Sequence, residues 1–156
     1  MKKDIFIDTN IASRFTNPMD MEYIKLINRL LKCESSSQNN AYLAVSNKLL
    51  AEYNRSTMNS STDTCIGVII NTLISQGRLT VITNDQIEEF QKFHFKKRLL
   101  RKLKSNQEDR EHIPVVFMSE RKYALTLDEN FTYDLLHFPR FIATVEKRPE
   151  KLPYDE

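Results

Sequence analysis

The chain has 156 residues, and its hydrophobic fraction of 40% and charged fraction of 28% are those of a soluble globular protein the size of one ordinary domain. Its net charge is only +2, so any argument for a nucleic-acid partner must rest on local clustering of charge. The only two glycines are Gly67 and Gly77, and this excludes a glycine-rich phosphate-binding loop.

Predicted strands alternate with predicted helices along the chain. The apolar residues 5–7 predict a buried strand, and apolar residues at helical spacing between 20 and 32 predict the first helix. The order continues with a strand at 41–45, a helix opened by Ser46, a helix at 63–75 that ends at Gly77, a strand at 79–82, a long helical segment to about 104, a helix capped by Ser105, a strand at 123–127, a short helix at 131–136 and a last strand at 141–145. This alternation predicts an α/β fold with a mainly parallel sheet. We expect one domain over 1–148 and an extended C-terminal tail over 149–156.

No targeting or membrane segment is expected. The apolar run that follows Met1 breaks at Asp8, and the longest apolar stretch, 65–74, is too short to span a bilayer. Cys33 and Cys65 match no metal-binding spacing, and we expect both to be core thiols. These features favour a cytoplasmic protein without membrane association.

Two apolar runs far apart in the chain each lead to an aspartate. Asp8 follows the strand at 5–7, and Asp128 follows the strand at 123–127. In an open parallel sheet such residues fall at the carboxyl edge, where ligands bind. Two carboxylates at one edge repel each other unless a cation lies between them. The pair therefore suggests an acidic metal site.

Two further acids lie at suggestive positions, although each has a simpler explanation. Glu52 falls within the helix after the second strand, where a solvated face would account for it. Asp109 falls in the first turn of a helix, where it would complement the helix dipole. Asp134 is expected to be an exposed helix residue rather than an outer ligand of a metal site. Mg²⁺ prefers oxygen ligands and keeps several waters, so a few carboxylates suffice to bind it.

On these residues the chain resembles the PIN-domain nucleases, in order and spacing over nearly its whole length. The matching residues are Asp8, Thr9 and Asn10, then Leu50, Ala51 and Glu52, then Asp109, and then residues 125–131. The resemblance implies a central parallel sheet flanked by helices and an activity that cleaves phosphodiester bonds in RNA. It also implies that Mg²⁺ or Mn²⁺ is bound by the catalytic residues, with polar support from two others. The four catalytic residues are Asp8, Glu52, Asp109 and Asp128, and the two supports are Asn10 and Thr126.

The function that we predict is a metal-dependent endoribonuclease. Small PIN proteins of this size resemble toxins held by an antitoxin. An antitoxin protein is therefore an expected partner in addition to RNA, and formation of a homodimer is a further possibility. The alternative is a catalytically inactive PIN-like scaffold that binds RNA or protein. A phosphotransferase resembling the haloacid dehalogenases is disfavoured, because it would need a second aspartate where Asn10 stands.

The third acidic position is the least certain on the sequence. Pro114 follows Asp109 by five residues within one expected helix, which must therefore kink or restart at the proline. Either arrangement could redirect Asp109, so Glu108 and Glu111 remain alternatives to it.

Residues 92–104 are rich in lysine and arginine, and two interpretations stay open. The segment is either a helix with a solvated basic face or a surface that follows the phosphates of a nucleic acid. On the second interpretation the nucleic-acid-binding residues are Lys96, Lys97, Arg98, Arg101 and Lys102. The histidines His94, His112 and His137 lack metal-binding spacing, and no catalytic role is expected for any of them.

Overall fold

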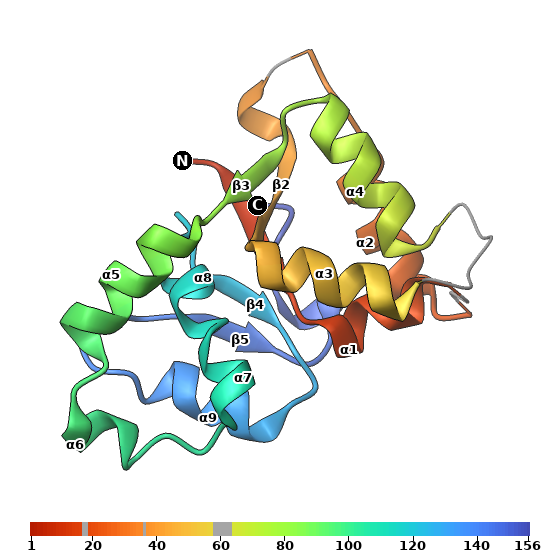
Figure 1. Ribbon diagram of the computed structural model, residues 1–156. Helices are drawn as coiled ribbons and strands as arrows, with labels where there is room; N and C mark the ends of the chain where they lie inside the picture. The colour runs from red at the N-terminus through yellow and green to blue at the C-terminus, as the bar shows by residue number, and fades with distance from the viewer. Residues whose placement is uncertain (17–18, 36, 58–63) are drawn as a thin grey trace.

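Strand β1 lies at the centre of a sheet in which neighbouring strands are parallel (Figure 1). The computed structural model describes residues 1–16, 19–35, 37–57 and 64–156, and within these the sheet has five strands in the order β3-β2-β1-β4-β5. The strands are β1 (Lys3–Ile7), β2 (Ala41–Val45), β3 (Leu79–Val81), β4 (Tyr123–Leu125) and β5 (Thr144–Glu146). The α/β class and the parallel sheet predicted from the sequence are confirmed.

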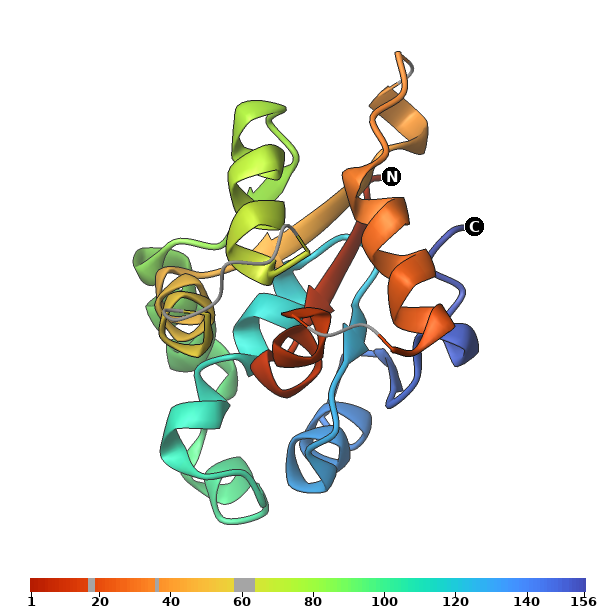
Figure 2. The same cartoon turned by 90° about the vertical axis from the view of Figure 1, so that its right-hand side faces the viewer.

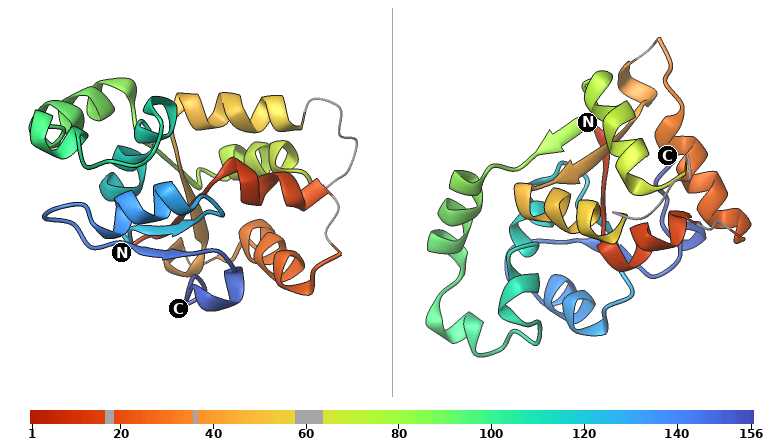
Figure 3. Two further views of the ribbon diagram at one scale, coloured as in Figure 1. Left: turned by 90° about the horizontal axis from the view of Figure 1, so that it is seen from below. Right: turned by 45° about the vertical axis from the view of Figure 1, so that its right-hand side comes forward.

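Helices cover both faces of the sheet. In Figures 2 and 3, α2 (Met21–Leu31) lies on one side of β1 and α3 (Asn47–Ser56) on the other. The other α-helices are α1 (Thr9–Ala12), α4 (Ile66–Ser75), α5 (Asn84–His94), α6 (Lys97–Leu100), α7 (Gln107–Arg110), α8 (Ile113–Met118) and α9 (Glu129–Leu136). Short 3-10 turns are η1 (Ser13–Thr16), η2 (Ser37–Asn39) and η3 (Pro149–Lys151).

Residues 5–7 of β1 are apolar because this strand lies at the centre of the sheet. Ile5, Phe6 and Ile7 are all buried, and Ile5 and Ile7 pair in register with Leu43 of β2 and Leu125 of β4. A strand that is covered on both faces has no solvent side on which a polar residue could alternate. This is why the first polar side chain beyond β1, that of Asp8, lies where the strand leaves the sheet.

Local capping signals place several helix ends. Ser46 accepts a hydrogen bond from the backbone N–H of Leu49 at 3.1 Å and so caps α3, as predicted. Gly77 has φ of 66° and follows Gln76, the C-cap of α4, and the N–H of Arg78 donates to the carbonyl of Leu73 at 2.8 Å. This left-handed turn ends α4 at the predicted place. The helix was expected to begin at residue 63, which lies outside the described residues, and α4 begins at Ile66.

The segment between β3 and β4 departs from the predictions. The long helix expected to reach residue 104 ends at His94, and α6 follows as a separate short helix. Ser105 does not cap the next helix. Instead, the side chain of Asn106 accepts from the N–H of Asp109 at 2.8 Å. Pro114 lies in the first turn of α8, where its missing N–H costs nothing, so the helix restarts rather than kinks.

The C-terminal residues pack onto the domain instead of extending from it. Residues 149–151 form η3, and Leu152 is buried in the core. Asp155 forms an ion pair with Arg29 of α2 at 2.6 Å. The last strand also differs from the prediction, because β5 covers 144–146 rather than 141–145. Cys65 is buried as expected, whereas Cys33 is exposed. Over the described part of the chain, none of the helices combines the length and the apolar character that crossing a bilayer requires.

Candidate active site

The two strand-end aspartates lie at the same edge of the sheet because their strands are neighbours. Asp8 directly follows β1, and Asp128 follows β4 after a short loop. The backbone N–H of Asp8 donates to the carbonyl of Leu125 at 2.9 Å, which continues the pairing of the two strands to this edge. The carboxyl edge of a parallel sheet is where α/β proteins bind their ligands.

All four predicted acids line one cavity at this edge. The cavity has a volume of about 470 Å³, and it is open to solvent on one side. Its acids come from the loop after β1, from α3, from α7 and from the N-terminus of α9. The lining residues are Asp8, Thr9, Asn10, Glu52, Arg55, Ser56, Asp109 and Asp128.

Thr126 connects the two strand-end aspartates. Its hydroxyl is buried and donates to Oδ2 of Asp8 at 2.6 Å. The hydroxyl oxygen of Thr126, Oγ1, also accepts from the backbone N–H of Asp128 at 3.1 Å. One hydroxyl therefore orients the carboxylate of Asp8 and fixes the chain where Asp128 begins.

Asn10 makes a second connection between the same two segments. Its side-chain amide donates to Oδ2 of Asp8 at 3.3 Å, and its carbonyl oxygen accepts from the N–H of Leu127 at 3.2 Å. Both residues predicted as polar supports thus contact Asp8 in the structure.

Each strand-end aspartate also caps a helix. Oδ1 of Asp8 accepts from the N–H of Thr9 at 2.8 Å, and Oδ1 of Asp128 accepts from the N–H groups of Asn130 and Phe131 at 2.9 and 3.1 Å. Among the described residues, Oδ2 of Asp128 accepts no hydrogen bond and so is free for another ligand. Capping therefore explains one oxygen of Asp128 and leaves the other oxygen available.

Of the three acids considered for the third acidic position, Asp109 is the one that lines the cavity. Of the alternatives, Glu111 forms an ion pair with Lys48 at 2.8 Å, and neither Glu108 nor Glu111 lines the cavity. The restart of the helix at Pro114 places Asp109 in the separate short helix α7.

His112 is a site residue that the sequence analysis missed. Its ring is buried, and Nε2 lies 2.7 Å from Oε2 of Glu52. The other ring nitrogen, Nδ1, is buried and has no hydrogen-bond partner among the described residues. The available signal was a polar residue three positions after Asp109, at the start of the otherwise apolar run 113–117.

The cavity concentrates negative charge. Burial raises the pKa of Asp8, against the opposing hydrogen bond from Thr126. Burial also raises the pKa of Asp109, and the charges of Asp128, Asp8 and Glu52 raise it further. For Glu52, burial alone would raise the pKa, but the hydrogen bond and charge of His112, together with the charges of Lys48 and Arg55, outweigh it and lower the pKa.

This donor set fits a hard divalent cation in chemistry and in charge. The carboxylate oxygens suit Mg²⁺ or Mn²⁺, and the mutual repulsion seen at Asp109 would be relieved by a cation. Over the described residues, however, no group of three or more histidine, cysteine, aspartate or glutamate side chains lies close enough to hold one ion as placed. Coordination by more than two of the acids would therefore require waters or small side-chain movements.

The predicted nucleic-acid-binding residues lie away from this cavity. Lys96, Arg98 and Lys102 line a separate groove near α6, whereas Lys97 and Arg101 are exposed and line neither. Asp134 was expected to be exposed, and this was wrong. It is buried and accepts hydrogen bonds from the backbone of the loop that follows α6.

Comparison with known proteins shows which known fold this chain resembles. The chain matches no family model, and no curated protein matches it in sequence. It is similar to a chain in the crystal structure of VapBC2 from Rickettsia felis bound to a DNA fragment from their promoter, with a TM-score of 0.55 and 18% sequence identity. The match covers 91% of this chain and 98% of that chain. The fold is PIN-like.

Proposed function

We propose that the protein is a metal-dependent endoribonuclease. The observation that carries the proposal is that four acids from four separate segments line one cavity at the carboxyl edge of a PIN-like fold: Asp8, Glu52, Asp109 and Asp128. Clustered carboxylates that raise one another's pKa repel each other and so do not stabilise a fold, whereas a site that binds a cation requires them.

The proposed reaction is hydrolysis of an RNA phosphodiester bond, in which a water oxygen bonds to phosphorus as a ribose oxygen leaves with a proton. When bound, Mg²⁺ or Mn²⁺ supplies activation of water and neutralisation of charge on the phosphate. Without a cation the acids would repel the substrate.

The residues around the acids would keep them oriented and help to hold the substrate. Thr126 and Asn10 hold Asp8 through the hydrogen bonds described above, and His112 holds Glu52. Arg55 and Ser56 line the same cavity from the C-terminal half of α3, where they are placed to contact a phosphate group.

The test is cleavage of single-stranded RNA by the purified protein. We expect cleavage with Mn²⁺ or Mg²⁺, and loss of cleavage in EDTA. Asp8→Asn and Asp128→Asn should each lower the rate by at least about 100-fold, the scale of an important transition-state interaction. Asp85→Asn is the matched control, because Asp85 is exposed in the first turn of α5 and does not line the acidic cavity.

The inactive scaffold remains the alternative, since as placed the four acids do not yet form one coordination group. Cleavage that persists in EDTA contradicts the metal mechanism. RNA binding without cleavage in any divalent ion favours the scaffold.

An antitoxin is the partner that we propose beside RNA. The similar crystal structure contains VapBC2 bound to DNA, which makes a toxin–antitoxin setting the natural one to test. A small gene next to this one should encode a protein that co-purifies with the chain and blocks RNA cleavage. Full cleavage in the presence of that protein would argue against it.

A further inference from the structure

A basic groove lies at the far end of the helix that begins at the acidic cavity. Its volume is about 640 Å³, and its lining includes four lysine or arginine side chains and no acidic residue. The lining residues are Phe93, His94, Lys96, Arg98, Leu99, Lys102, His137, Pro139 and Arg140. The groove is thus bordered by α5, by α6 and by the segment that follows α9.

The positive charge of the groove is not neutralised by the protein. Among the described residues, none of Lys96, Arg98, Lys102 and Arg140 forms a salt bridge with an acid. Burial lowers the pKa of His94, and the charges of Arg140 and Lys96 lower it further. These charges are therefore available to an anionic ligand.

Helix α9 connects the groove to the acidic cavity. Asp128 caps the N-terminus of α9 and lines the cavity, whereas His137 follows its last residue, Leu136, and lines the groove. A helix rises 1.5 Å per residue, so the nine residue steps from Asp128 to His137 correspond to about 13.5 Å along the axis of α9. This distance is within the reach of a few nucleotides of one strand.

Two aromatic side chains lie at the groove end of α9, Tyr133 in its last turns and His137 directly after it. The rings of Tyr133 and His137 are stacked, with centroids 4.0 Å apart and planes at 22°. The ammonium group of Lys104 lies 3.8 Å from the centroid of Tyr133. His137 and Lys104 take the two faces of the Tyr133 ring, so the exposed ring of His137, supported from behind by Tyr133, is the platform on which an unpaired base can stack.

Buried Asp134 holds the loop after α6 against α9. Its two carboxylate oxygens each accept a backbone N–H, from Lys104 and from Ser105, both at 2.8 Å. The loop that carries Lys104 is thereby fixed relative to the helix that carries Tyr133.

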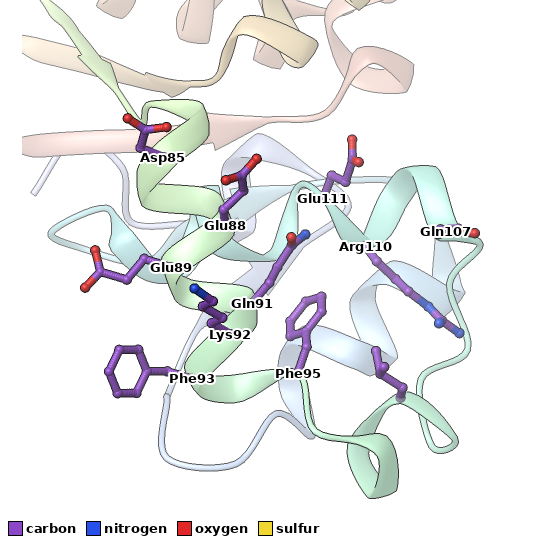
Figure 4. A pocket seen from close by; sticks show the side chains of 11 residues that line it. Asp85, Glu88, Glu89, Gln91, Lys92, Phe93, Phe95, Gln107, Arg110 and Glu111 are labelled. Carbon is purple, nitrogen blue, oxygen red and sulfur yellow. The ribbon is translucent and has the colours of Figure 1, made fainter.

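The opposite side of α5 has the wrong charge for a nucleic acid. A larger cavity of about 1110 Å³ lies there between α5 and α7 (Figure 4). Its lining carries two cationic side chains, Lys92 and Arg110, against four carboxylates, which are those of Asp85, Glu88, Glu89 and Glu111. A phosphate backbone would be repelled from this face and attracted to the groove.

We infer that a single strand of RNA crosses the exposed face of α9, with its backbone in the basic groove and an unpaired base stacked on His137, whose ring Tyr133 supports. The inference rests on the proposed function, since the phosphate to be cleaved would lie at the acidic cavity. The groove then selects single strands, because bases within a duplex are not free to stack on the platform.

Binding is measured without catalysis, as the fluorescence anisotropy of a labelled 12-nucleotide oligouridine RNA in EDTA over a range of salt concentrations. The double variant Arg98→Gln, Arg140→Gln should reduce the salt slope by about 1.4, because each lost phosphate contact contributes about 0.7 for single strands. The matched control Lys97→Gln, Arg101→Gln removes the same charge near α6 but outside the groove, and it should change the slope little.

The platform is tested with Tyr133→Leu and Tyr133→Phe. Tyr133→Leu should weaken single-strand binding about 10-fold, and Tyr133→Phe should keep most of the affinity, since it retains the ring. Neither change should affect binding of a duplex RNA of equal length. Circular dichroism checks that each variant is folded.

Equal weakening by the groove and control pairs, or no effect of Tyr133→Leu on single strands, overturns the inference even if the protein cleaves RNA. Groove-dependent binding by a protein that cleaves no RNA supports the inference and contradicts the proposed function instead.

Discussion

Nε2 of His112 lies 2.7 Å from Oε2 of Glu52, although the two residues are 60 positions apart in the chain. The backbone N–H of His112 also donates to the carbonyl of Asp109 at 3.0 Å. One residue thus contacts two of the four segments that supply the acids. Residues that orient a metal ligand in this way commonly change metal affinity 10- to 100-fold when they are replaced.

We therefore expect His112→Phe to weaken Mn²⁺ binding by about 10-fold, because the ring is kept against Phe6 while the donor to Glu52 is lost. His112→Gln supplies an amide donor and should retain most of the affinity. Titration of Mn²⁺ followed by electron paramagnetic resonance gives the binding constant directly. Equal affinities of wild type and His112→Phe would show that His112 only fills the core.

Thr126→Val removes the buried hydroxyl that joins Asp8 to Asp128 at nearly constant volume. We expect a loss of about 1–3 kcal/mol in the free energy of unfolding, because the N–H of Asp128 and the carboxylate of Asp8 each lose a partner. RNA cleavage should fall with it. Thr126→Ser keeps the hydroxyl and is the control. Urea unfolding measures stability, and a Thr126→Val protein as stable as wild type would contradict the bridging role.

Asp109→Asn should raise the thermal midpoint of the metal-free protein by about 2 °C at neutral pH, because it removes one of several mutually repelling charges. With Mn²⁺ the wild type should have the higher thermal midpoint, since the variant lacks one charge that would bind the ion. Scanning calorimetry with EDTA and with Mn²⁺ measures both. A lower midpoint of the variant in EDTA would indicate a structural role for Asp109.

The pH dependence has a defined sign. The pKa values of Asp8 and Asp109 are raised above 3.8, so ionising them costs the folded state free energy. Their contribution favours the folded state as the pH falls through the raised values and is lost as the pH rises through them. Wild type in EDTA should therefore gain more stability than Asp109→Asn as the pH falls from 7 toward the ordinary value of 3.8. Equal gains in the two proteins would contradict the raised pKa of Asp109.

Asp134→Asn should lower the free energy of unfolding by about 1–3 kcal/mol, because one of the two oxygens that accept from Lys104 and Ser105 becomes an NH2 group facing a backbone N–H. It should also weaken RNA binding, since the loop beside Tyr133 loses its anchor. Asp85→Asn is again the matched control for stability. An unchanged free energy of unfolding in Asp134→Asn would show that the hydrogen bonds of Asp134 do not stabilise the fold.

The sequence by itself determined the α/β class, the buried first strand and the two strand-end aspartates. These follow from local chemistry. An apolar run such as Ile5, Phe6 and Ile7 can only be satisfied within a covered sheet, and the first polar residue after it must lie at the sheet edge. The caps at Ser46 and Gly77 are local for the same reason, because each acts on the backbone of its own helix.

Only the tertiary structure decided which distant residues meet. His112 looked like an isolated histidine and Asp134 like an exposed acid, since the partner of each lies 29 to 60 positions away in the chain. The same holds for the basic residues 92–104. Because the expected long helix ends at His94, some of their side chains line the groove and others point into solvent. A periodic pattern sets which face of one helix is polar, but the hydrogen bonds from the loop after α6 to Asp134 of α9 decide which segments that face lies beside.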